Sequence, residues 1–427
     1  QLAYNNGRAD LFPKYTGRPT PGAVGTFATK ALVMGYFDGN TVTALWNYAQ
    51  HFAMSDNHFG AQYGPSTPGA INLVSGQTSG MLVKKHSDSS VVIPDGQGTL
   101  FTLTNDAAPA IDICSDSISY WRDNEITATG KNIGNLLTAA NVTWGWFQGG
   151  FDLTRANAAG VKGCTRTTKS TIAPGTPQTD YLPHHEPFQY YPSTANPTHT
   201  RPSSVSLIGT SNDGANHQYD LHDFFDAVSA GNFPAVSYIK ARAFQDGHGG
   251  YSDPLDEQNF IVGVLNFLQQ RPEWSKTAVI IMYDDSDGWY DHAYTPPTNA
   301  SFNAKYDRLT SSGACGVKGQ TAQLGGPADK GPVNGRCGPG ARLPLLVVSP
   351  WAKQNYVDHT LLTQASVLRF VENNWLKGQR LGGGSFDANA ADINTLFDFA
   401  HGGRTPVLFL DDSTGVPVSK PSNRLPY

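Results

Sequence analysis

Residues 277–292 read TAVIIMYDDSDGWYDH, an apolar run of strand length that ends in four aspartates and a histidine. Such a run is typical of a buried strand in an α/β sheet. Asp284 and Asp285 are neighbours, so a turn helped by Gly288 is needed before both carboxylates can face one ion. Adjacent carboxylates repel each other unless a cation or a proton lies between them. The stretch therefore predicts a hard divalent metal at the carboxyl edge of an α/β sheet.

A solvated acidic turn is the alternative explanation of the same residues. The aromatic side chains of Tyr283, Trp289 and Tyr290 favour the metal site, because ordinary exposed turns consist mainly of small and polar residues.

The composition of the 427-residue chain is that of a loop-rich globular enzyme, with 15% charged residues, 45 glycines and 28 prolines. The net charge is -5, and no cluster of lysines and arginines indicates a nucleic-acid surface. The longest apolar runs have strand length, so the sequence predicts no transmembrane segment. We expect one α/β domain over residues 1–427.

Strand and helix signals alternate along the chain. Strand 235–240, a helix that starts at Pro254 after the N-cap Asp253, and strand 277–283 predict a βαβ unit with two parallel strands. We expect an α/β fold with a mostly parallel sheet and helices on both faces. Further expected elements are helices at 41–54, 132–140, 221–230 and 361–376 and strands at 142–147 and 343–349. Segments 80–130 and 152–204 are rich in Gly, Pro, Ser and Thr, so we expect them to be loop insertions.

The four cysteines form two pairs that flank loops, Cys114 with Cys164 and Cys315 with Cys337. Neither pair has the C-x-x-C spacing of a zinc site. We predict these two disulfides, which indicate an exported protein. Four buried free thiols are the alternative.

The segment GPSTPGAINLVS at 64–75 contains a candidate nucleophile. Pro68 and the apolar residues after it predict a helix that starts just after Ser66. A hydroxyl there faces free backbone N–H groups and the positive end of the helix dipole, which favours an alkoxide or a bound phosphate. An ordinary N-cap is the alternative use of such a residue.

Three histidines are candidates for contacts with phosphate. His184 and His185 are adjacent, and His248 lies just beyond strand 235–240, at the predicted sheet edge that also holds Asp284. Imidazole can bind phosphate oxygens and can protonate a leaving group near neutral pH.

Taken together, these motifs resemble the bacterial phospholipase C and acid phosphatase family of phosphoesterases, which is related to the alkaline phosphatase superfamily. The resemblance implies an alkaline phosphatase-like fold, one active-site metal and a Ser or Thr nucleophile that is transiently phosphorylated. The segments that carry the resemblance are 35–46, 64–69, 184–190, 252–258, 283–292, 343–351 and 370–375.

The resemblance implies a role for each candidate residue. Ser66 aligns with the nucleophile and is a third metal ligand in the implied site, with Thr67 as the fallback nucleophile. Asp284 and Asp285 align with the acidic metal ligands. Histidines 184, 185 and 248 align with residues around the phosphate, and we expect His248 to be the acid for the leaving alcohol.

The identity of the metal and of the substrate stays open. Oxygen ligands favour Mg, Mn or Ca, while the nearby histidines leave Zn possible. We expect a phosphate ester or a phospholipid as substrate.

One departure from the family pattern concerns the metal site. Family members have a Glu-Asn pair at the end of their first strand, whereas the Glu-Asn pair here, Glu372 and Asn373, lies in a late helix. The chain also starts at Gln1 without an export signal. We therefore expect a secreted or periplasmic protein whose amino-terminal fragment, cut from the same precursor, supplies half of the metal site. A catalytically inactive secreted binding protein that retains the fold is the alternative.

Overall fold

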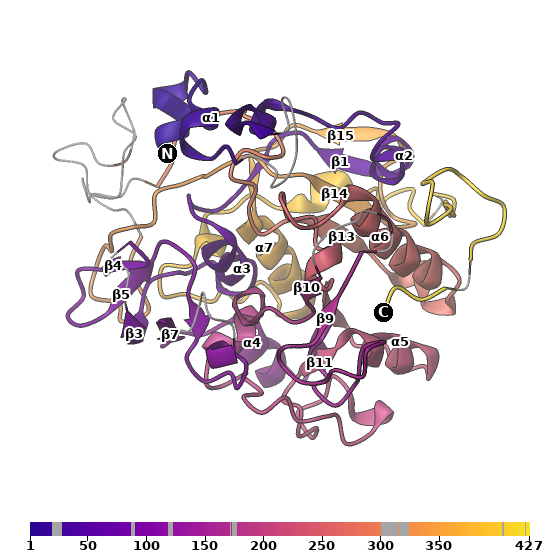
Figure 1. Ribbon diagram of the computed structural model, residues 1–427, viewed down its shortest axis with the longest axis horizontal. Coiled ribbons are helices and arrows are strands. Elements are labelled where there is room, and N and C mark those ends of the chain that lie inside the picture. The colour runs from indigo at the N-terminus through magenta and orange to yellow at the C-terminus, as the bar shows by residue number, and fades with distance from the viewer. Residues whose placement is uncertain are drawn as a thin grey trace.

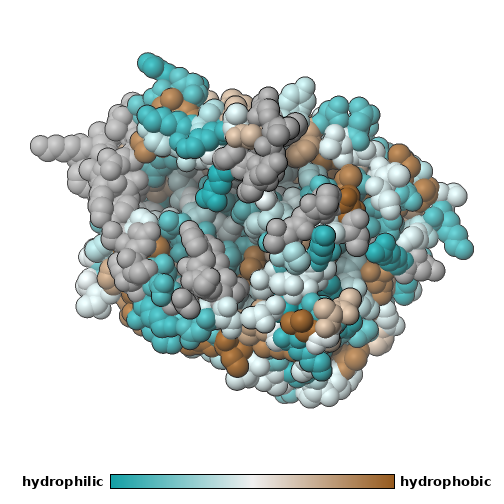
Figure 2. Space-filling model, viewed as in Figure 1, coloured by the Kyte–Doolittle hydropathy of each residue, from teal (hydrophilic) through white to brown (hydrophobic). Residues whose placement is uncertain are grey.

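The computed structural model describes residues 1–18, 28–86, 90–117, 123–170, 172, 177–299, 315, 324–403, 405–422 and 424–427. Its helices and strands form the mixed α/β architecture that the sequence predicts (Figure 1). Within the described ranges, no helix is both long and apolar enough to cross a membrane. On the face shown in Figure 2, hydrophobic residues are scattered among hydrophilic ones, as on ordinary protein surfaces.

Two sheets carry the strands that lead to the candidate site. The four-stranded sheet has the order β13-β14-β1-β15, and β14 runs antiparallel to both of its neighbours. The three-stranded sheet, β11-β8-β12, is entirely parallel. Of these two sheets, only the three-stranded one matches the mostly parallel sheet that the sequence predicts. The strands are β1 (Ala53–Ser55), β8 (Trp144–Gln148), β11 (Gln218–Asp220), β12 (Val236–Lys240), β13 (Val279–Met282), β14 (Leu345–Val348) and β15 (Tyr356–Asp358).

The predicted βαβ unit has the expected elements but not the expected pairing. Strand β12, helix α6 (Pro254–Gln269) and strand β13 follow one another as predicted, yet β12 pairs with β8 and β13 pairs with β14. Both are edge strands among the described residues, and all four residues of β13 are only half-buried. An apolar pattern identifies a strand, but its partner depends on packing between distant segments.

The predicted helices form close to their predicted bounds because their capping residues act as expected. Asp220 and Asp253 accept hydrogen bonds from backbone amides at the starts of α5 and α6, and Asn132 forms a capping box on α4. In α2, Ala44 and Tyr48 are buried, while Trp46 is 48% exposed. The helices are α1 (Phe12–Tyr15), α2 (Thr43–His51), α3 (Ser66–Ser75), α4 (Ile133–Ala139), α5 (Leu221–Ser229) and α7 (Gln364–Trp375).

Segment 80–130 contains a five-stranded sheet, β4-β5-β3-β7-β6, where the sequence suggested loops. Its strands are short and separated by Gly and Pro, so their alternation is too brief to be distinguished from a loop. The strands are β3 (Met81–His86), β4 (Val92–Pro94), β5 (Phe101–Leu103), β6 (Ala108–Pro109) and β7 (Asn124–Ala128).

The described part of segment 152–204 is mostly irregular. It contains the two-residue strands β9 (Thr167–Thr168) and β10 (Gln178–Thr179) and the short 3-10 helices η5 (Pro183–His185) and η6 (Pro187–Tyr190). Both predicted disulfides, Cys114–Cys164 and Cys315–Cys337, are present. The remaining elements are β2 (His58–Phe59), β16 (Leu362–Thr363), η1 (Leu2–Gly7), η3 (Lys30–Met34), η4 (Ser115–Ser117), η7 (Val205–Leu207), η8 (Ala243–Gln245), η9 (Pro272–Lys276), η10 (Phe386–Ala388) and η11 (Ile393–Leu396).

The main hydrophobic core joins both sheets to helices α5 and α6. Phe147 of β8, Phe224 of α5, Leu265 of α6 and Val347 of β14 belong to one buried cluster. Helix α3 lies between the β3–β7 sheet and α7 (Figure 1). This packing fixes α3, which carries the candidate nucleophile, against the end of β13.

Candidate active site

Helix α3 places Ser66 next to the aspartate pair. Ser66 is the first residue of the helix and is 7% exposed, and its Oγ donates a 3.1 Å hydrogen bond to Oδ1 of Asp285. The close approach requires Gly69, because a Cβ at that position would lie 1.9 Å from the backbone oxygen of Asp284. The structure therefore brings the predicted nucleophile and the predicted metal ligands together.

The start of α3 is less open than the sequence suggested. Asp106 Oδ1 accepts 2.9 Å hydrogen bonds from both the backbone N and the Oγ1 of Thr67. Pro68 has no N–H, and the Gly69 amide already donates to the oxygen of Pro65 at 3.2 Å. Asp106 thus caps the helix from a distant loop, and few amides remain for an anion. Burial raises the pKa of Asp106 to about 6, although its hydrogen bonds from Thr67 oppose the shift.

The two aspartates have different surroundings. Asp284 Oδ2 lies 3.5 Å from the Nζ of Lys240, the last residue of β12. Burial, followed by the charges of Asp287 and Asp284, raises the pKa of the Asp285 carboxyl well above its ordinary value. The side-chain amide of Gln364, at the start of α7, donates to the backbone oxygen of Asp284 and fixes the turn.

The donor set fits a hard divalent cation. Asp284, Asp285 and Ser66 present oxygen atoms only, and the charges of Asp287, Asp284 and Asp106 crowd Asp285. Cations that act on these carboxylates include Lys240, at 3.5 Å from Asp284, and the amino-terminal ammonium and Arg18, whose charges act on Asp287. Three protein oxygens are fewer than such an ion takes, so water or further groups must complete the coordination.

The three candidate histidines also converge on this edge. The rings of His184 and His185 lie 4.2 Å apart, and Nδ1 of His185 is 3.6 Å from Oδ2 of Asp246. The ring of His248 stacks on Tyr251 at 4.1 Å. The charge of Lys240 acts on all three imidazoles.

All three imidazoles are mainly neutral at neutral pH. Burial, and then the Lys240 charge, lowers the pKa of His184 to about 3, and burial lowers the pKa of His185 well below its usual value. Desolvation also lowers the pKa of His248, although part of that side chain reaches solvent. Burial raises the pKa of Asp246 to about 7. At neutral pH the histidines therefore suit hydrogen bonding to phosphate better than ion pairing.

Two other groups of potential metal ligands occur in the described ranges, and in both of them some of the ligands are already engaged. Asp112, Cys114 and His199 are close together, but Cys114 is disulfide-bonded and the other two are hydrogen-bonded to each other at 3.1 Å. His222, Asp223 and Asp226 form the second group, in which Arg201 pairs with Asp223. These groups are better explained as structural networks.

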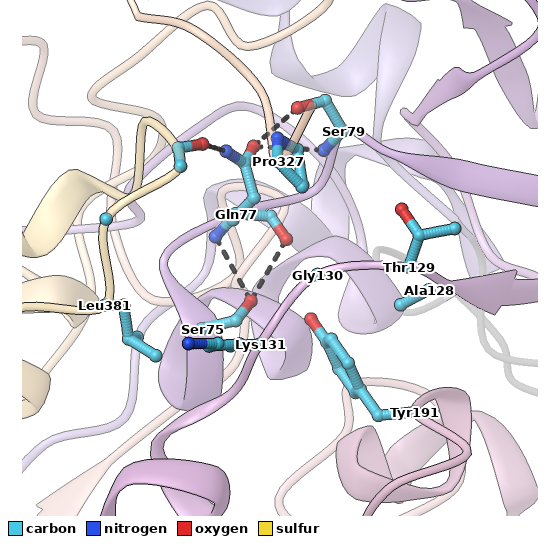
Figure 3. A pocket seen from close by; sticks show the side chains of 12 residues that line it. Ser75, Gln77, Ser79, Ala128, Thr129, Gly130, Lys131, Tyr191, Pro327 and Leu381 are labelled. Carbon is cyan, nitrogen blue, oxygen red and sulfur yellow. Dashed lines mark hydrogen bonds between the residues drawn. The ribbon is translucent and has the colours of Figure 1, made fainter. Parts of the chain in front are cut away.

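A polar pocket of about 260 Å³ lies at the opposite end of α3 from Ser66 (Figure 3). Ser75 Oγ accepts from the Gln77 amide at 3.2 Å, and Ser79 Oγ donates to the Gln77 side chain at 2.6 Å. The Gln77 side-chain amide in turn donates to the oxygen of Gly383. These hydrogen bonds fix the end of α3. Because the polar groups satisfy one another and no candidate residue lines the pocket, we do not assign the active site to it.

Three charged residues of the site escaped sequence reasoning. Lys240 gave a usable signal, since it ends the predicted strand 235–240 at the sheet edge where Asp284 was expected. Asp246, two residues before His248, gave a weaker one. Asp106 gave none, because only the tertiary fold brings it to α3 from 39 residues away.

The chain is similar in sequence to several phospholipases C. Non-hemolytic phospholipase C of Pseudomonas aeruginosa is 32% identical over 196 residues, which are 44% of this chain and 26% of that protein. Hemolytic phospholipase C of the same organism is 31% identical over 193 residues, 45% of this chain and 24% of that protein. Non-specific phospholipase C6 of Arabidopsis thaliana is 30% identical over 160 residues, 33% of this chain and 24% of that protein.

The matched part is thus about a quarter of the length of these relatives. The model of the Phosphoesterase family matches residues 1–376, which include every candidate residue of the site. The chain belongs to the Phosphoesterase family.

Proposed function

We propose that this protein hydrolyses phosphoric esters through a phosphoserine intermediate at Ser66. The observation that carries the proposal is the hydrogen bond from the Ser66 hydroxyl to Asp285, at a helix start that also faces Asp284. The family match and the phospholipase C relatives support a phosphoric ester hydrolase.

In the first step, the Oγ of Ser66 forms a bond to phosphorus while the bond from phosphorus to the leaving oxygen breaks. The hydroxyl proton is directed at Asp285 Oδ1, which accepts it. His248 donates a proton to the leaving alcohol, for which its lowered pKa requires acidic conditions. In the second step, water attacks the phosphoserine and gives a proton to His248, while the proton on Asp285 returns to the leaving Ser66 Oγ. A phosphomonoester substrate then yields phosphate, and a phosphodiester yields a phosphomonoester.

Charge on the phosphoryl oxygens is balanced by groups fixed before substrate binds. The Lys240 ammonium is held by Asp284, and the buried imidazoles of His184 and His185 can each donate an N–H. These groups take the place of the backbone amides at the start of α3, because the amides of Thr67 and Gly69 already donate to Asp106 and Pro65.

We propose that Asp284, Asp285 and Ser66 hold one divalent ion. When bound, such an ion supplies positive charge for the phosphate and lowers the pKa of the serine hydroxyl. The oxygen donors favour Mg, Mn or Ca, and the neighbouring imidazoles are compatible with Zn.

We also propose that the protein is exported and works with a further segment of its precursor. The two disulfides support an oxidising compartment. Strands β12 and β13 each have one unpaired edge among the described residues, and both strands are mostly half-buried. An added extended segment would cover these edges.

Steady-state hydrolysis of p-nitrophenyl phosphate and p-nitrophenyl phosphorylcholine tests the proposed function. We expect turnover of at least one ester by the native protein, loss of turnover after chelation, and recovery with one of the four metals. Failure of every metal with both esters would favour the inactive binding protein. Preference for the phosphorylcholine ester would place the substrate among phospholipids.

A further inference from the structure

A second cavity, of about 460 Å³, lies away from the candidate active site. It is bounded by η8, the first turns of α6 and the segment 424–427. Its volume falls within the range of small-molecule sites. The side chains that decide its chemistry are Arg242, Phe244, Leu255, Asp256, Leu425 and Pro426.

Arg242 is the main polar feature of this cavity. Its Nε is enclosed and has no hydrogen-bond acceptor, and the guanidinium forms no ion pair within the described ranges. The carboxylates whose charges act on it, Asp180 and Asp220, each pair with another side chain, and Oδ1 of Asp180 has no hydrogen-bond partner. Asp180 binds Arg166 at 2.6 Å, and Asp220 binds the ring of His222 at 2.8 Å. A desolvated guanidinium without an acceptor is costly, so a ligand that supplies one would be favoured.

The charge of the lining is positive. Lys169 and Arg424 also line the cavity, and neither forms an ion pair with a described residue. Among the described side chains of the lining, Asp256 is the one carboxylate, and it accepts a hydrogen bond from Ser170. These side chains thus include three cations and one carboxylate, while Phe244 and Leu255 give the same cavity apolar walls.

We propose that this cavity binds a small oxyanion with a short apolar body, in which the oxyanion pairs with Arg242. The planar guanidinium fork matches the oxygens of a carboxylate or a phosphate. The apolar walls accept the attached alkyl or aryl group. The candidate residues of the active site do not line this cavity, so the proposal does not depend on the proposed hydrolysis.

Segment 240–248 links the two sites. Lys240 contacts Asp284 in the active site, Arg242 lines the cavity two residues later, and Asp246 and His248 return to the active site. A ligand on Arg242 would therefore bind the same segment that carries candidate residues of the active site.

Isothermal titration with octanoate and octylphosphonate tests the proposal. The two probes carry the same apolar body on a carboxylate or on a non-hydrolysable phosphate analogue, so they distinguish the two oxyanions. We expect at least one to bind, and Arg242→Gln to weaken it about tenfold or more by removing a charge-assisted pair. Leu255→Trp, which fills the cavity but keeps the arginine, should weaken binding as well.

Two controls make the result specific. Arg271 stacks on Phe267 outside the cavity, so Arg271→Gln should bind the probes like the native protein. Asp284→Asn should also leave binding unchanged, which excludes capture of octylphosphonate by the active site. Thermal unfolding of each variant checks that it folds. Absence of binding at millimolar probe, or equal binding by native protein and Arg242→Gln, would overturn the proposal.

Discussion

Ser66→Ala should lose more activity than Thr67→Ala, whereas Thr67→Ala should lose more stability than Ser66→Ala. The two hydroxyls are adjacent at the start of α3, but Ser66 donates to Asp285 and Thr67 donates to Asp106. Only Ser66 lies against the proposed metal ligands. Ser66→Ala should therefore lower kcat by about 10⁴-fold or more, as the loss of a nucleophile does elsewhere. Thr67→Ala should keep kcat within about tenfold, since it leaves the nucleophile in place.

The stability ranking follows from burial and hydrogen bonding. Ser66→Ala removes one hydrogen bond, whose net worth is about 0.5–1.5 kcal/mol. Thr67 is fully buried, and its replacement removes a methyl group and leaves part of the Asp106 carboxyl without a donor. Together these losses cost about 2–4 kcal/mol, although the Thr67 amide still donates to Asp106.

Hydrolysis kinetics and urea unfolding of the two variants measure both rankings. Mass spectrometry of acid-quenched native enzyme should also locate a phosphate on Ser66. Retention of kcat by Ser66→Ala with loss in Thr67→Ala would show that Thr67 is the nucleophile. Retention of kcat by both variants would refute the phosphoserine mechanism.

Three further predictions concern charge at the site. Asp284→Asn or Asp285→Asn should lose both the bound metal and the activity. Full metal occupancy in both variants, measured by elemental analysis, would favour the acidic-turn explanation. The pKa of His248 is lowered, so its acid form is lost as the pH rises through that lowered value. We therefore expect kcat to be highest at acidic pH. A kcat that increases up to alkaline pH would exclude His248 as the acid. Burial raises the pKa of Asp106 from 3.8 to about 6, so the metal-free protein should lose up to about 3 kcal/mol of stability as pH rises between these values. Asp106→Asn, which keeps an acceptor for Thr67, should remove this loss, and an unchanged pH slope in urea unfolding would contradict that account.

Local signals were sufficient to predict the elements that position the site. Asp253 followed by Pro254 marks the start of α6, and the apolar run before Asp284 marks β13. Each depends on residues within one or two turns of the chain, where capping and periodicity act. The same locality explains why Ser66 could be placed at the start of a helix.

Long-range relations could not be predicted in the same way. The sequence gives no indication that Asp106 occupies the Thr67 amide, because the contact depends on how the 80–130 sheet packs on α3. Nor does the βαβ pattern determine that β12 and β13 join different sheets. In both cases the free energy comes from tertiary contacts that a single sequence does not display.

The separation of β12 and β13 explains how the candidate site is held together. Lys240 is the last residue of β12 in one sheet, and Asp284 follows β13 of the other sheet. Their ion pair therefore joins two sheets that have no strand pairing between them among the described residues. Helix α6 reinforces this link, since Glu257 accepts the Tyr283 hydroxyl next to Asp284. Side-chain contacts and helix α6 therefore hold the ends of β12 and β13 together, as backbone hydrogen bonds would within one sheet. The further segment proposed above, if it paired with both edges, would fix the distance between Lys240 and Asp284.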